Sequence, residues 1–252
     1  MMTNHRVSNV FNRILMCAAL FLPLSISAQT LTVYTEDLPP YQIKKRSGEI
    51  TGFSAELIRA LFQRANLKAN IRMVPWARAY NSALKQKDTL IISIVRTPER
   101  EGLFHWIGQV DKLEYYFYRL SNRDDIELTS FEQAKNYRIG VGANSFEYEK
   151  LTYLGFPYVV SVPTYNQLMA MLKANRYDLF FSADRTFKGM LENSNSAPES
   201  FETAFHISSI NQQMYIAMNK SSDPKLVKRL TIAYQQLNES GEVERLAQIW
   251  LN

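Results

Sequence analysis

The sequence has little cysteine and little histidine. Among its 252 residues there is one cysteine, Cys17, and there are three histidines. This scarcity excludes a disulfide framework and Cys-based zinc sites. No nucleophile, histidine and acid occur in a pattern typical of a catalytic site. The sequence therefore predicts a protein that is not an enzyme and that holds no cofactor and no metal.

Charge of one sign, glycine and proline are also scarce. The chain has 29 Lys and Arg against 24 Asp and Glu, and the basic residues are scattered along it. A nucleic-acid partner is therefore not indicated. Nine Gly and nine Pro, with no internal repeat, exclude collagen, solenoid and propeller architectures. A hydrophobic content of 46% indicates a globular, core-forming chain.

Long apolar runs are missing except near the N-terminus. There, Ile14–Leu24 follows a segment with two arginines and no acid, and it has about half of the ~20 residues that a membrane span needs. We interpret residues 1–28 as a signal peptide cleaved before Gln29, with an uncleaved anchor as the alternative. Cys17 follows Met16, where a lipid-attachment site would have a small residue, so lipid attachment at Cys17 is not expected. We expect a periplasmic protein, if the source is Gram-negative.

After this segment, strand and helix patterns alternate. Apolar residues recur at helical spacing over residues 53–65, and residues 90–95 form an apolar run typical of a strand buried on both faces. This order predicts an α/β fold with parallel strands. The expected strands are residues 31–35, 71–74, 90–95, 115–120, 138–141, 158–162, 178–182 and 214–218. The expected helices are residues 53–65, 77–85, 146–154, 165–174, 186–191, 224–238 and 242–251, with a short one after Ser130.

The alternation restarts after an apparent break at residues 108–114. The C-terminal tail is too small to fold alone, so we expect it to return to the first α/β unit. The chain would then form two lobes, residues 29–110 with 214–252 and residues 111–213. It would cross between them near residues 110–114 and 209–213.

Several short motifs, in this order and spacing, resemble the family-3 bacterial solute-binding proteins, the polar amino acid receptors of ABC importers. The resemblance implies a type II periplasmic binding fold, with two parallel-rich sheets joined by a two-strand hinge. It also implies a monomer that clamps a small solute and delivers it to an inner-membrane ABC permease. The motifs are Pro40-Tyr41, Gly52 to Leu57, Val74 to Arg78, Arg96 to Arg100 with Phe104, Arg138 to Val141, Tyr177 to Leu179, and Ile249 to Leu251.

Arg100 ends the Thr-x-x-Arg element and, by the resemblance, pairs with the ligand's α-carboxylate. A guanidinium suits this role because its planar fork makes two parallel hydrogen bonds. The alternative is a solvated charge between Glu99 and Glu101. The main chain at Ser93 and Val95 ends a predicted parallel strand, where such sheets place ligands.

Four further side chains are candidates for ligand contact. Ser145 precedes a helix, so it could complete a carboxylate site or simply cap the helix. Trp76 and Tyr41 could form an aromatic wall. Arg78 could face the cleft or cap its own helix.

An acid that follows the Tyr177-Asp178-Leu179 strand would, by the resemblance, hold a ligand ammonium. Asp184 is this candidate, although it lies one residue beyond the usual interval. Counting Arg100 and Arg78 against Asp184 favours a ligand that carries a carboxylate, an amino acid or another organic acid, over a cation.

Two other functions stay open. A sensory protein that presents its ligand to a membrane receptor would use the same closed form. A dehydratase-type enzyme on this scaffold would need a general acid or base in the cleft, for which Glu36, Asp37 and Asp184 are the available carboxylates.

Overall fold

The computed structural model describes residues 29–194 and 196–251. The predicted signal peptide, residues 1–28 with Cys17, lies outside the described residues. Within the described ranges, none of the helices combines the length and the apolar character that crossing a membrane requires.

The first part of the chain forms an α/β unit with parallel strands. Every residue of β5 is buried, as the apolar run predicts, and α2 buries its Leu57, Ile58 and Leu61. Gly52 precedes α2 with a φ of 106°, and a Cβ there would lie 2.7 Å from the Pro40 carbonyl oxygen. This unit contains β1 (Thr30–Thr35), the hairpin β2 (Ile43–Lys44) and β3 (Ile50–Thr51), α2 (Phe53–Arg64), β4 (Lys68–Met73), α3 (Trp76–Lys85), β5 (Thr89–Val95) and the 3-10 turn η1 (Pro98–Arg100).

A second α/β unit follows, and the C-terminal helices come after it in the chain. The helices α7 and α8 pack against α2, so the tail returns to the first unit. The remaining elements are β6 (Phe104–Leu120), η2 (Phe131–Asn136), β7 (Ile139–Gly142), α4 (Phe146–Tyr153), β8 (Val159–Val162), α5 (Tyr165–Lys173), β9 (Leu179–Ala183), α6 (Asp184–Asn193), η3 (Pro198–Ser200), β10 (Phe201–Asn219), α7 (Pro224–Glu239) and α8 (Glu242–Trp250).

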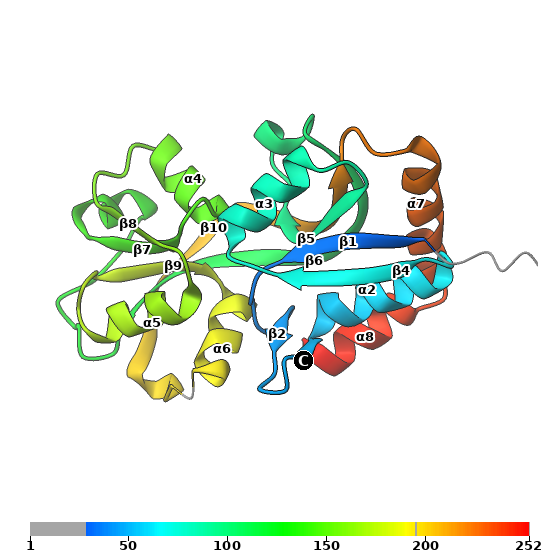
Figure 1. Ribbon diagram of the computed structural model, residues 1–252. Helices are drawn as coiled ribbons and strands as arrows, with labels where there is room; N and C mark the ends of the chain where they lie inside the picture. The colour runs from blue at the N-terminus through cyan, green and yellow to red at the C-terminus, as the bar shows by residue number, and fades with distance from the viewer. Residues whose placement is uncertain (1–28, 195, 252) are drawn as a thin grey trace, which may run out of the picture.

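The two long strands β6 and β10 join the units (Figure 1). The predicted break at residues 108–114 is wrong, because these residues lie inside β6 and pair antiparallel with β10 over most of its length. The strand expected at residues 214–218 is only the last part of β10. The polar residues in the middle of β6 are typical of a loop. They are nevertheless in a strand, because β10 provides hydrogen-bond partners for their main-chain groups.

One mixed sheet results, not the two sheets expected. Its strand order is β4-β1-β5-β10-β6-β9-β7-β8. The pairs β1/β4, β1/β5, β7/β8 and β7/β9 are parallel, whereas β10 and β6 run antiparallel to their neighbours. We call β4, β1 and β5 with α2, α3, α7 and α8 the first unit, and β9, β7 and β8 with α4, α5 and α6 the second unit. Figure 1 shows the units on either side of the β6–β10 pair.

Candidate functional site

A small cavity lies between the two units, where strands of both end. The first unit contributes Trp76, Ser93, Val95 and Arg100, and the second contributes Ser145, Glu147 and Tyr165. Its volume is about 30 Å³, roughly the share of one water molecule. A molecule larger than water therefore does not fit in this cavity in the closed arrangement.

Arg100 is the cation of this cavity, and it is only 2% exposed. Its Nη1 donates to the Val95 carbonyl oxygen at 3.2 Å, and its Nη2 donates to Glu149 Oε2 of α4 at 2.8 Å. The guanidinium carbon lies 5.2 Å from the ring centre of Tyr80 and 6.0 Å from that of Trp76. Because Arg100 is almost fully buried, it is not a solvated charge, which was the alternative given for it above.

Two further contacts hold the units together. The indole nitrogen of Trp76 donates to the Asn144 carbonyl oxygen at 2.8 Å. On α6, a Cβ added at Gly189 would lie 2.5 Å from the Pro39 carbonyl oxygen, so only glycine allows this close approach. With the Arg100–Glu149 pair, these contacts define a closed arrangement.

Ser93, in the cavity wall, has a φ of 58°, in the left-handed region that a serine rarely adopts. The Ser93 hydroxyl bonds to Gln42 Nε2 and lies 2.9 Å from Ser54 Oγ. Since that hydroxyl is already engaged, a ligand contact at Ser93 would use its main chain.

Two carboxylates, Glu36 and Glu147, also line the cavity. Burial raises the pKa of Glu36 well above its ordinary value, and repulsion from Glu147 and Asp37 adds to the shift. Burial also raises the pKa of Glu147, although a hydrogen bond with the Ser145 side chain, another with its own main chain and the attraction of Arg100 oppose the shift. A cation between the two carboxylates would favour their ionised forms.

Two buried polar atoms in the cavity wall have no hydrogen-bond partner among the described residues. They are Arg100 Nε and the hydroxyl of Tyr115. Buried polar atoms are nearly always satisfied in folded proteins. Both are therefore available to a polar ligand.

Five of the eight predicted site residues come together here: Trp76, Ser93, Val95, Arg100 and Ser145. Ser145 also caps α4, because its hydroxyl accepts from the Tyr148 main-chain nitrogen at 3.2 Å. Arg78 lies exposed on α3 and does not line the cavity.

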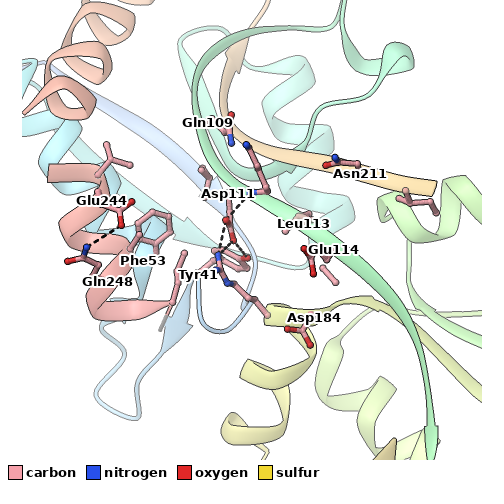
Figure 2. A pocket seen from close by; sticks show the side chains of 18 of the residues that line it. Tyr41, Phe53, Gln109, Asp111, Leu113, Glu114, Asp184, Asn211, Glu244 and Gln248 are labelled. Carbon is pink, nitrogen blue, oxygen red and sulfur yellow. Dashed lines mark hydrogen bonds and ion pairs between the residues drawn. The ribbon is translucent and has the colours of Figure 1, made fainter. Parts of the chain in front are cut away.

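The remaining two residues, Tyr41 and Asp184, lie elsewhere, in a separate cavity of about 730 Å³ beside the middle of β6. The Tyr41 hydroxyl donates to Asp111 at 2.6 Å, and Arg185 pairs with the same carboxylate at 2.9 Å. Asp184 accepts from the Tyr118 hydroxyl and pairs with Lys188. Figure 2 shows Tyr41 pointing toward Asp111, with Asp184 at the start of α6. Both residues therefore have partners within the protein.

The charges that line this cavity differ from those counted in the sequence. The cavity contains Arg100 with Glu36 and Glu147, whereas Arg78 and Asp184 are outside it. Acids therefore outnumber bases among the residues that line this cavity.

Comparison with known proteins agrees with the fold. The family model of the bacterial extracellular solute-binding proteins, family 3, matches residues 31–252. The chain belongs to this family. Proteins of this family bind solutes, and two of the similar proteins are described as arginine-binding proteins.

Individual relatives of this family-3 protein are distant. The arginine-binding extracellular protein ArtP of Bacillus subtilis is 24% identical over 222 residues, which cover 85% of this chain and 82% of ArtP. An ancestral arginine-binding protein bound to arginine has a TM-score of 0.78 at 18% identity, covering 90% of this chain and all of the other. A histidine kinase sensor domain similar to periplasmic binding proteins has a TM-score of 0.81 at 17% identity, covering 90% and 97%. At these identities the structures establish the shared fold and leave the ligand open.

The site residues predicted from the sequence do not include Glu147, Tyr165 or Tyr115, and Glu36 is there only a possible catalytic group. A positional signal existed for three of them. Glu36 directly follows β1, while Glu147 and Tyr165 stand in the first turns of helices that follow β7 and β8. These are the positions where α/β sheets bind ligands.

Proposed function

We propose that this family-3 protein captures an amino acid with a cationic side chain between two lobes and delivers it to an ABC importer. In this proposal the lobes are residues 29–110 with 214–252 and residues 111–213, and β6 and β10 form the hinge. Separation of the lobes would admit the ligand, and the bound ligand would stabilise the closed form.

The balance of charge in the cleft carries this proposal. Arg100 supplies one positive charge and a free Nε for an α-carboxylate, while Glu36 and Glu147 supply two acceptors for cations. A neutral zwitterion would leave one acid without a partner, at a cost in desolvation. A basic amino acid matches all three groups, and the arginine-binding relatives support the same class.

A thermal-shift screen tests the proposal. Ligand at about a hundred times its dissociation constant adds roughly 2.7 kcal/mol to the free energy of unfolding. We expect arginine, lysine and ornithine to raise the melting temperature, and glutamate and succinate to leave it unchanged. X-ray scattering with the best ligand should show a smaller radius of gyration. Stabilisation by dicarboxylates alone would contradict the proposal.

Delivery to an importer is tested separately. Cells that lack this protein should lose high-affinity uptake of the ligand identified in the screen. Normal uptake together with a lost transcriptional response to the ligand would favour the sensory alternative, which the shared fold of the kinase sensor domain also permits.

A further inference from the structure

The ion pair between Arg100 and Glu149 differs from the other contacts of the cleft, because it joins the candidate carboxylate anchor to an acid of the opposite unit. Arg100 belongs to η1 and Glu149 to α4, and their Nη2 and Oε2 atoms are 2.8 Å apart. The Arg100 side chain is 2% exposed, whereas that of Glu149 is 43% exposed. The pair therefore has a buried, fixed partner and a partner that can turn toward solvent.

The chemistry of this contact is that of a bound ligand. Glu149 places a carboxylate on the guanidinium that the proposed function assigns to the ligand's α-carboxylate. Arg100 retains an unpaired Nε, so one hydrogen-bond donor of its guanidinium is still free. The Val95 carbonyl and the rings of Tyr80 and Trp76 hold the guanidinium from other sides. The arginine is thus held ready for a carboxylate, whichever molecule supplies it.

The charge that a ligand must carry is different when Glu149 supplies the carboxylate that pairs with Arg100. Arg100 is then neutralised from within the protein, and Glu36 and Glu147 are left to meet the ligand. Two carboxylates in a buried cleft favour a ligand with two positive charges and no negative one. A diamine or a guanidino-amine has this charge pattern.

We infer that Glu149 is an internal substitute for the ligand carboxylate, so that the cleft also binds cationic amines that lack a carboxylate. The inference rests on the proposed function, in which Arg100 binds the carboxylate and Glu36 with Glu147 binds the cation. An amino acid displaces Glu149 into solvent when its carboxylate takes Arg100. An amine leaves the Arg100–Glu149 pair intact and closes the lobes around it.

Calorimetric titration with two matched pairs of compounds tests this inference. Arginine is compared with agmatine, and lysine with cadaverine, since each amine is its amino acid without the carboxylate. The parent protein should bind each amine within about tenfold of the corresponding amino acid. The Glu149→Gln variant should bind the amino acids about fivefold or more tightly, because their carboxylate no longer competes, and the amines about fivefold or more weakly.

Glu199→Gln is the matched control, since Glu199 is exposed on η3 and does not line the cleft cavity. It should change neither affinity. Glu149→Ala should repeat the opposite shifts of Glu149→Gln, which separates loss of charge from a new amide contact.

Three results would overturn the inference. If the parent binds arginine or lysine but not the amines, Glu149 does not replace a ligand carboxylate, and the proposed function stands. If Glu149→Gln shifts both classes in the same direction, Glu149 acts only on closure. If the parent binds neither class, the proposed function fails and the inference fails with it.

Discussion

The pKa values of carboxylates shift in opposite directions in the second unit and in the cleft. Asp178, just before β9, accepts from Arg138 Nε at 2.9 Å, from the Arg138 main-chain nitrogen at 3.0 Å and from Arg123 Nη1 at 3.0 Å. Hydrogen bonds from Arg138 lower its pKa to about 2, against the opposing effect of burial. In the cleft, burial raises the pKa of Glu36 and of Glu147.

The difference lies in the partners. The second unit satisfies Asp178 by itself, so this acid stabilises the fold. Among the described residues no ion pair is formed by Glu36 or Glu147, although Arg100 attracts Glu147, so both acids lack a basic partner in direct contact. Perturbed, unpartnered titratable groups in a cleft indicate a binding site, whereas saturated ones indicate structure.

The largest expected effect is on the basic partner in the cleft. Arg100→Ala should weaken the binding of arginine and lysine by about 100-fold or more, because a buried ligand carboxylate then loses its charge-assisted hydrogen bonds. Calorimetry measures the loss. Arg96→Ala is the control, because Arg96 pairs with Glu101 at the surface, and it should change the affinity less than about threefold. Parental affinity in Arg100→Ala would show that the carboxylate anchor is another residue.

A smaller effect on ligand affinity should follow from removing one of the two cleft acids that lack a basic partner. Glu36→Gln should weaken the binding of basic amino acids by about 10- to 100-fold, through the loss of one charge-assisted contact. In the ligand-free protein it should instead stabilise the fold. Because the pKa of Glu36 is raised in the folded state, that state binds its proton more tightly than the unfolded chain does.

The parent's free energy of unfolding should therefore fall as pH rises above the ordinary carboxyl pKa of 4.5. Glu36→Gln should be the more stable protein at pH ~8, and the difference should vanish near pH ~4. Thermal unfolding at the two values checks this, with Glu199→Gln as the control. A variant less stable than the parent at the higher pH would show that Glu36 already has an internal partner.

The smallest effect on ligand binding is expected from replacing Asp178, whose carboxylate is paired within the second unit. Asp178→Asn should lower the free energy of unfolding by about 1–2 kcal/mol at neutral pH, a value limited because Arg138 is 48% exposed. Ligand affinity should change less than about twofold, because Asp178 is not a cleft residue.

The pH dependence has the opposite sign to that of Glu36. The folded pKa of Asp178 is about 2 against an ordinary 3.8, so its stabilisation is present above pH 3.8 and is lost as pH falls through about 2. The free energies of unfolding of the parent and of Asp178→Asn, measured by denaturant titration, should therefore become equal at the lowest pH. A constant difference from pH ~7 to ~2 would mean that packing, and not charge, explains the effect.

Local pattern predicted most helices and strands of this chain. The apolar run of β5 and the helical spacing in α2 depend on neighbouring residues, and both were found where expected. β6 was different, because the residues that hold its middle extended lie in β10, about a hundred positions away. Gly108 appeared to be a turn, yet its missing side chain makes room for the ring of Tyr234 on α7.

The sequence by itself determined the alternation of strands and helices and the motif that ends in Arg100, because both depend on residues close together in the chain. Only the tertiary structure decided which charges meet. Asp184 and Glu36 each follow a strand directly. The first pairs with Lys188 and Tyr118 beside β6, while the second faces Glu147 across the cleft. Charges act over a few ångströms in space, so the charges that line the cleft follow from how the two units meet.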